Sequence, residues 1–122
     1  MEKVIFREWF TSNGTRVLAG KSAGNNEKLI EQAGDKEVLL HTAKPGSPFV
    51  NLKTKKPTKA EIYDAALFCA KYSQDWRDNK KAVKVHVFKT EDVHKERRMK
   101  LGTFGVKKFK EVVAKRVDIL KI

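Results

Sequence analysis

The segment Val83–Phe88 constrains the fold of this chain most. Three valines there alternate with a lysine, a histidine and a phenylalanine. A period of two places the valines on one side of an extended strand and the other three side chains on the opposite side. The chain is therefore expected to contain a sheet with at least one buried face, and the rest of the sequence has to supply its other strands and its cover.

Turn signals separate further short segments that are rich in strand-forming residues. Asn13-Gly14 is the strongest short hairpin signal of the chain, and Lys44–Pro48 is rich in proline and glycine. The strands predicted in this way cover residues 3–10, 15–19, 38–41, 49–52 and 104–106. Residues 109–120 fit either a strand or an amphipathic tail helix, and their β-branched content favours a strand.

Two helices are predicted to cover the sheet. A capping box that starts at Thr58 precedes small apolar residues at helical spacing, which predicts one long helix (about 58–76). One short helix (about 25–33) would begin at a cap supplied by Asn25 or Asn26. We therefore expect an α+β fold with a mostly antiparallel sheet, and a chain of 122 residues is long enough for a single domain with one core.

The charge of the chain is large and unevenly distributed. Lys and Arg number 27 against 15 Asp and Glu, a net charge of +12. Residues 1–78 carry 13 basic and 10 acidic side chains, a net of +3, whereas residues 79–122 carry 14 basic and 5 acidic ones, a net of +9. A localised basic surface attracts nucleic acid, an anionic membrane or an acidic protein, and nucleic acid is the favoured partner.

The sequence gives little support for a disulfide-bonded, metal-binding, secreted or membrane-spanning protein. Cys69 is the only cysteine, so no internal disulfide and no zinc site of cysteines is expected. No metal and no cofactor is therefore predicted. The N-terminal residues contain no apolar stretch of signal-peptide length and no segment approaches a membrane span, so we expect a cytoplasmic protein with no membrane partner.

Two segments offer polar chemistry, each with a structural alternative. The loop Gly20–Asn26 lies between a predicted strand and helix, where free backbone N–H groups and Lys21 suit a phosphate; a tight connection without a ligand is the simpler interpretation. His41 ends a predicted strand and is placed for catalysis or for contact with a base, or for a hydrogen bond to neighbouring backbone. Ser47 with His41 as its base has no evident carboxylate to orient it, so catalysis is not expected.

The segment that carries most of the charge also contains aromatic residues. Phe88 and Phe104 lie among its lysines and arginines, and basic groups with aromatic side chains are the minimal requirement for RNA contact. The alternative is that both phenylalanines are core residues, as Phe in alternating strands usually is, which would leave only the charges for binding.

Five groups of residues, in this order along the chain, resemble the NFACT-R domain. This is the conserved module of the ribosome quality-control family that includes NEMF, Caliban and bacterial fibronectin-binding protein A. The residues that carry the resemblance are Phe6–Phe10 with Asn13-Gly14, Gly20–Ala23 with Asn25 and Asn26, Leu40-His41 with Pro45–Ser47, Tyr72–Trp76, and Val87–Val93 continuing into Leu101–Lys108. The resemblance implies a mixed α/β domain that contacts RNA in the setting of tRNA and the large ribosomal subunit.

These observations together predict a stand-alone RNA-binding domain for tRNA or rRNA, with a separate protein partner supplying the other domains of the family. Lys21, Asn25, His41 and Ser47 are expected to line a polar pocket between loops. The residues expected to neutralise phosphates are Lys89, Lys95, Arg97, Arg98, Lys100, Lys107 and Lys108. The alternatives are an RNA-modifying or hydrolytic enzyme, or its substrate-presenting subunit, that uses His41, and a basic protein–protein adaptor.

Overall fold

The fold is built on one antiparallel sheet. In the computed structural model, which describes residues 4–122, six strands lie in the order β1-β2-β4-β3-β5-β8, and each neighbouring pair is antiparallel. Their bounds are Arg7–Phe10, Arg16–Ala19, Val50–Leu52, Val38–Thr42, Val83–Lys89 and Lys110–Ala114 in that order. The predicted α+β class with a mostly antiparallel sheet is confirmed, as is the hairpin at Asn13-Gly14.

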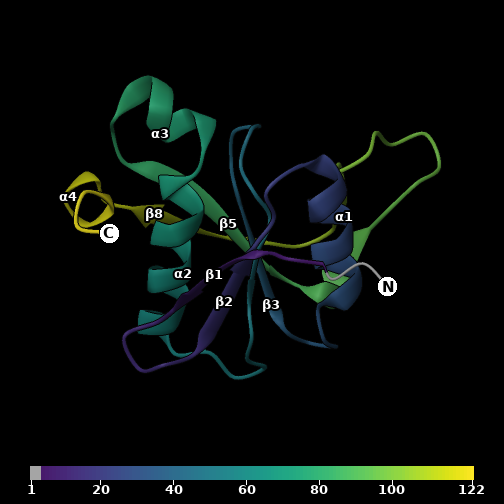
Figure 1. Cartoon of the computed structure of the whole chain (residues 1–122), viewed down its shortest axis with the longest axis horizontal. Coiled ribbons are helices and arrows are strands. Elements are labelled where there is room, and N and C mark those ends of the chain that lie inside the picture. The colour runs from purple at the N-terminus through teal and green to yellow at the C-terminus, as the bar shows by residue number, and fades with distance from the viewer. Residues whose placement is uncertain (1–3) are drawn as a thin grey trace.

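Helices cover the two faces of this sheet unequally (Figure 1). The helix α1 (Ala23–Gln32) lies on one face, whereas α2 (Lys59–Lys71), α3 (Gln74–Asn79) and the short α4 (Arg116–Ile119) lie on the other. We call these two sides the α1 layer and the α2 layer. Among residues 4–122, no helix is long and apolar enough to cross a bilayer.

The strand β5 shows why both faces need cover. Val83 and Val85 are fully buried in the core beneath α2. Phe88 points to the opposite face and packs with Leu29 of α1 and Leu39 of β3 in a second, smaller core. On the same face of β5 the exposure increases toward its start: His86 is half-buried and Lys84 is exposed. The alternating side chains of β5 therefore contribute to two cores, one on each face of the sheet, and neither face is exposed to solvent along its whole length.

The single long helix predicted over residues 58–76 is interrupted at Tyr72 and Ser73, so that two helices occupy this part of the chain. The chain leaves α2 after Lys71, and α3 starts three residues later. Ser73 is buried at this break: its hydroxyl donates to the carbonyl of Ala70 (2.6 Å) and accepts from the backbone N–H of Trp76 (3.1 Å), so that it caps α3. The backbone N–H of Gln74 donates to the carbonyl of Gly46 at 2.7 Å. A serine cap and a tertiary hydrogen bond together stop the first helix.

The predictions for the α1 cap and for the C-terminal segment also need correction. The N-cap of α1 is Ser22, not Asn25 or Asn26, and its hydroxyl accepts from the N–H of Asn25 at 3.1 Å. Residues 109–120 form the strand β8 only as far as Ala114, and α4 follows. The hydroxyl of Tyr63 donates to the Asp118 carboxylate at 2.5 Å, which holds this turn of helix against α2.

A second, two-stranded sheet arises from the chain between β5 and β8. The short strands β6 (Val93–His94) and β7 (Gly105–Val106) pair with each other after the 3₁₀ turn Thr90–Asp92. The segment 95–104 between them forms a long loop beside α1, at the right of Figure 1. This loop carries four of the 14 basic residues that the sequence places after residue 78.

Candidate nucleic-acid interface

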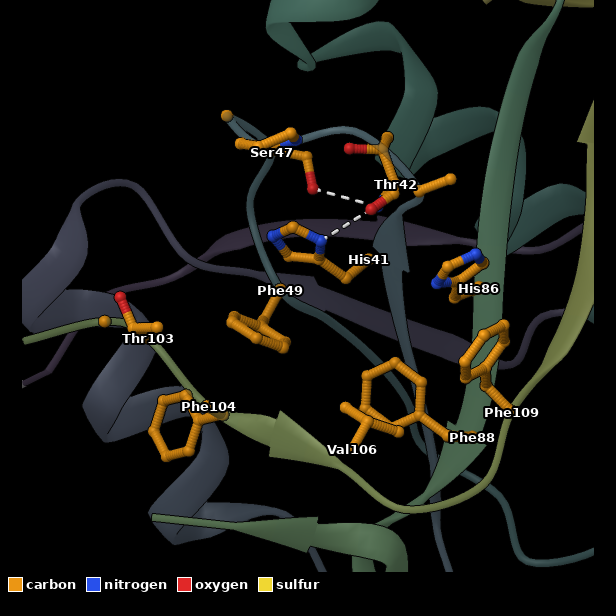
Figure 2. Close-up of a pocket in the computed structure, with 14 residues that line it drawn as sticks. His41, Thr42, Ser47, Phe49, His86, Phe88, Thr103, Phe104, Val106 and Phe109 are labelled. Atoms are coloured by element: carbon orange, nitrogen blue, oxygen red, sulfur yellow. Dashed lines mark hydrogen bonds between the residues drawn. The ribbon is translucent and has the colours of Figure 1, made fainter. Parts of the chain in front are cut away.

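A cavity of about 440 Å³ opens on the α1 layer, between the β3–β4 turn and the segment that leads into β7 (Figure 2). We call it the aromatic cavity. The side chains labelled in Figure 2 come from β3, β5, the turn and the 103–109 segment. Its aromatic and polar lining residues are His41, Thr42, Ser47, Phe49, His86, Phe88, Thr103, Phe104 and Phe109. Rings on several sides and few polar groups make a space suited to a planar, partly polar ligand.

His41 supplies the best-defined polar group of this cavity. Its Nδ1–H donates to the carbonyl of Thr42 at 2.8 Å, since a carbonyl oxygen can only accept. Its ring lies 4.6 Å from the ring of Phe49. Burial lowers the pKa of the imidazole; the hydrogen bond to Thr42 opposes this shift and the charge of His86 adds to it. The ring is therefore neutral near pH 7, with Nε2 as an acceptor that has no partner among the described residues.

His86 and Phe109 form the opposite wall. His86 on β5 is the cross-strand partner of His41 on β3, so both histidines face the same space. The rings of His86 and Phe109 are stacked, with centroids 3.9 Å apart and 20° between their planes. Phe109 is 53% exposed, which leaves an aromatic surface open to solvent. An exposed ring at the mouth of a cavity can stack on an unpaired base.

The structure separates the roles of the two phenylalanines singled out in the sequence. Phe88 is buried and belongs to the core beneath α1. Phe104 is half-buried: it packs edge-on against Phe49 at 5.4 Å and lines the cavity, and the Lys95 ammonium lies 4.8 Å from its ring centroid. The stacking candidates of this surface are therefore Phe104 and Phe109, and the second of these was missed in the sequence.

Ser47 contributes structure and not an activated nucleophile. Its hydroxyl accepts from the N–H of Thr42 (3.1 Å) and donates to the carbonyl of Pro48 (3.0 Å). His41 directs its Nδ1 to backbone, so the described residues contain no hydrogen bond that joins the serine to the histidine. The Cys69 thiol lies 3.9 Å from the Ser47 hydroxyl, but burial raises its pKa to about 12. A thiol that stays protonated at neutral pH is a poor nucleophile.

The predicted pocket between loops is in fact two cavities on either side of the β3–β4 turn. His41 and Ser47 line the aromatic cavity, while Lys21 and Ser47 line a second cavity of about 350 Å³. Asn25 lines neither. Its side chain accepts from the Lys21 N–H at 2.8 Å and donates to the carbonyl of Ile5 at 3.3 Å, so it fixes the shape of the loop instead.

Two of the predicted phosphate contacts turn out to be structural lysines. Lys95 remains accessible to solvent, but its ammonium lies 2.8 Å from the Glu27 carboxylate, 2.6 Å from the Lys100 carbonyl and 2.7 Å from the Thr103 carbonyl. The hydrogen bond from Lys95 is the main reason that the pKa of Glu27 is lowered. Lys89 donates to backbone carbonyls of other loops at 3.3 Å. Both ammonium groups therefore make hydrogen bonds within the protein and connect loops to one another.

The remaining predicted cations project from the surface. Arg97, Arg98 and Lys100 lie on the loop between β6 and β7, and Lys107 and Lys108 lie between β7 and β8; all five are exposed. Arg98 approaches Glu96 at 3.4 Å with 89% of its side chain exposed, a pairing of little energetic weight. Residues of the aromatic cavity lie within this basic segment and directly after it: Thr103 and Phe104 separate its two groups of cations, and Phe109 follows Lys108.

Besides Phe109, three more site residues could not be found from the sequence. His86 was read only as one member of an alternating strand, because its alignment with His41 depends on the register between β3 and β5. Arg7 and Arg77 are far apart in the sequence, yet both line the cavity that contains Lys21. Only the tertiary fold reveals that juxtaposition.

Comparisons with known proteins bear on this surface. The family model of the NFACT protein RNA binding domain matches residues 4–108. The archaeal Rqc2 homolog aRqcH of Methanocaldococcus jannaschii is 31% identical over 91 residues, which are 72% of this chain and 14% of that protein. The structure of the C-terminal part of the fibronectin/fibrinogen-binding protein from Streptococcus suis matches all of this chain and 50% of that one, with a TM-score of 0.86 and 20% identity. The chain thus spans a minor part of the first protein and half of the second, and the structural match is evidence for the fold alone.

Proposed function

The chain belongs to the family of NFACT RNA-binding domains, as its sequence motifs predicted, and from this premise we propose that it binds RNA in ribosome quality control. The single observation that carries the proposal is the position of the exposed basic segment 97–108 beside the aromatic cavity. Cations neutralise phosphates without regard to sequence, whereas rings and an unpaired acceptor can hold a base. The combination fits an RNA with an unstacked base better than it fits a uniform duplex.

Each part of the surface then has a defined task. The exposed cations Arg97, Arg98, Lys100, Lys107 and Lys108 contact the RNA backbone. Phe104 and Phe109 stack on a base, and Nε2 of neutral His41 accepts a hydrogen bond from an amino or imino group of that base. Lys89 and Lys95 act indirectly, because they hold the loops that carry these groups.

The proposed ligand is tRNA or rRNA, in the setting of the large ribosomal subunit. In this setting, we propose that the protein acts in the cytoplasm and that residues 1–122 act as one NFACT-R domain. The aligned archaeal relative is several times longer than the aligned segment, and we propose that this domain acts together with a separate protein partner.

Charge reversal tests the proposal. The variant Arg97→Glu/Arg98→Glu should bind tRNA or an rRNA fragment more weakly by tenfold or more at 100 mM salt, to a similar extent for all sequences. Its slope of log affinity against log salt should also become shallower, by about 0.7 per lost contact on a single strand or about 0.9 on a duplex. The matched control reverses Lys59 and Lys121, two exposed cations of the α2 layer.

Two outcomes would count against RNA binding. One is an affinity for tRNA and rRNA that does not depend on salt, or no binding at 50 mM salt. The other is an equal loss for the control variant, which would indicate attraction to net charge alone. Crosslinking in cell extract with and without ribonuclease then separates RNA from an acidic protein, since only a protein partner survives the nuclease treatment.

A further inference from the structure

The second cavity on the β3–β4 turn has an unusual charge composition. It measures about 350 Å³ and is enclosed by the start of β1, the loop before α1, the turn and the α2–α3 junction. Arg7, Lys21 and Arg77 all line it, together with Ser22, Ser47 and Tyr72, and no acidic residue is among its lining residues. We call it the basic cavity. Three cations from three separate segments converge here without a counter-charge.

The two arginines are held in place by one residue. The guanidinium of Arg7 lies 4.0 Å from the centroid of the Tyr72 ring. Arg77 donates to the carbonyl of Tyr72 at 3.3 Å and to the side chain of Gln74 at 2.9 Å. These contacts orient the guanidinium planes and leave further N–H donors free. Pre-oriented arginines lose little conformational entropy when they bind a planar or tetrahedral oxyanion.

These cations differ from other ordered cations of the chain. Lys53, Lys95 and Arg16 lie 2.8 Å, 2.8 Å and 2.6 Å from carboxylates of Glu37, Glu27 and Glu8. Within residues 4–122, neither Arg7 nor Arg77 is within 4.0 Å of a carboxylate, and the same holds for Lys21. Like charges brought together without a partner oppose folding, so such a cluster is explained best by an anionic ligand.

The cavity also has neutral groups that favour an anion. The hydroxyl of Ser22 is committed to capping α1, but the first residue of that helix, Ala23, lies on the cavity wall and turns the positive end of the helix dipole toward it. Gly46 and Ser47 line both this cavity and the aromatic cavity. A ligand that enters both would cross the β3–β4 turn at these two residues.

We propose that the basic cavity binds a phosphate group of the RNA strand whose base occupies the aromatic cavity. Arg7 and Arg77 would clamp the phosphate oxygens, and Lys21 would close the outer side. This inference rests on the proposed function and adds a fixed phosphate subsite to it, separate from the exposed cations of residues 97–108. The phosphate could belong to the chain interior or to a strand end, and the chemistry of recognition is the same.

The test uses short single-stranded RNA and two double variants of the full chain. Lys21→Gln/Arg77→Gln should lower affinity by tenfold or more and reduce the salt slope by about 0.7 for each of the two lost contacts. Lys59→Gln/Lys121→Gln removes the same charge from the α2 layer and should change affinity less than twofold. Arg77 also stabilises the start of α3. The single variant Lys21→Gln, whose ammonium makes no hydrogen bond or ion pair among residues 4–122, must therefore show a loss in the same direction with an unchanged melting temperature.

Further arms separate the sources of the phosphate and the two proposals. Oligonucleotides with and without a 5′- or 3′-terminal phosphate are compared. If one terminal phosphate raises affinity for the wild type and Lys21→Gln/Arg77→Gln abolishes this gain, the cavity binds a strand end. If all the oligonucleotides bind the wild type equally, the bound phosphate is internal. If the wild type binds RNA and Lys21→Gln/Arg77→Gln matches the Lys59→Gln/Lys121→Gln control, the phosphate subsite is overturned while RNA binding stands. If no RNA binds at low salt, the proposed function itself has failed.

Discussion

Among the single residues, His41 couples the protonation of the aromatic cavity to folding. Its ring is half-buried, its Nδ1–H is committed to the Thr42 carbonyl, and burial lowers its pKa. In the unfolded chain the same imidazole has a pKa of about 6.5. At pH values between the folded and the unfolded pKa of His41, the unfolded state binds more protons than the folded state. The free energy of unfolding therefore falls as the pH is lowered through this range and levels off below the folded pKa.

The variant His41→Asn tests this coupling. Asparagine keeps a donor near the position of Nδ1 but does not titrate. Chemical denaturation at several pH values between 7 and 5 should give a shallower decline in the free energy of unfolding for the variant than for the wild type, whose slope from this group is at most about 1.4 kcal/mol per pH unit. Below the folded pKa of His41 the curves should run parallel, because the carboxylates with lowered pKa values, Glu27, Glu37 and Glu61, titrate in both proteins. Equal slopes between pH 7 and 5 would show that His41 titrates alike in both states.

At the scale of elements, the loop between β6 and β7 is fastened to α1 at one glycine. Gly102 has φ of +80°, and a Cβ atom there would lie 2.8 Å from the Cα atom of Ala23. Its N–H donates to the Glu27 carboxylate at 2.8 Å, beside the ammonium of Lys95. The close approach and the left-handed backbone both require glycine. This contact sets where the exposed arginines lie relative to the cavity.

Replacing Gly102 by alanine should therefore release the loop without removing any charge. We expect a loss of about 1–2 kcal/mol of stability, from the left-handed backbone and the clash with α1, and faster amide hydrogen exchange in residues 95–104. Affinity for RNA should fall severalfold while the salt slope stays the same, because the cations remain but are no longer pre-positioned. Gly24→Ala, in a helix position where the nearest atom is 3.9 Å away, is the control. Unchanged exchange in the variant would mean that the loop does not depend on this contact.

The elements themselves were largely predictable, and their junctions were not. Local signals such as Asn13-Gly14 and the capping box at Thr58 report on neighbours in the sequence, and the structure has both. The break at Ser73 depends on a hydrogen bond from the next residue to Gly46, which no local pattern records. The same applies to the basic segment: charge indicated its position, but the pairing of the Lys95 ammonium with Glu27 and two carbonyls depends on the tertiary fold.

At the scale of the whole molecule, the positive net charge lowers the stability of the free protein and raises its affinity for RNA. The chain carries +12, and most of the surplus lies on residues 79–122. Crowded cations repel one another in the folded state, which lowers stability. The same cations attract RNA, and both effects weaken with salt because the Debye length falls from about 30 Å at 0.01 M to about 10 Å at 0.1 M. The free protein should thus become more stable as salt rises, while its affinity for RNA declines.

Thermal unfolding with and without RNA measures both effects in one experiment. The melting temperature of the free domain should rise between 20 and 300 mM salt. RNA at a hundredfold excess over its dissociation constant should add about 2.7 kcal/mol at low salt, or roughly 10 °C for a domain of this size, and this increment should vanish as salt rises. The two curves should therefore converge at high salt. If the increase in stability caused by RNA persists at high salt, binding would depend on stacking in the aromatic cavity more than on phosphate contacts. If the stability of the free protein falls as salt rises, attraction within ion pairs would outweigh the repulsion among the surplus cations.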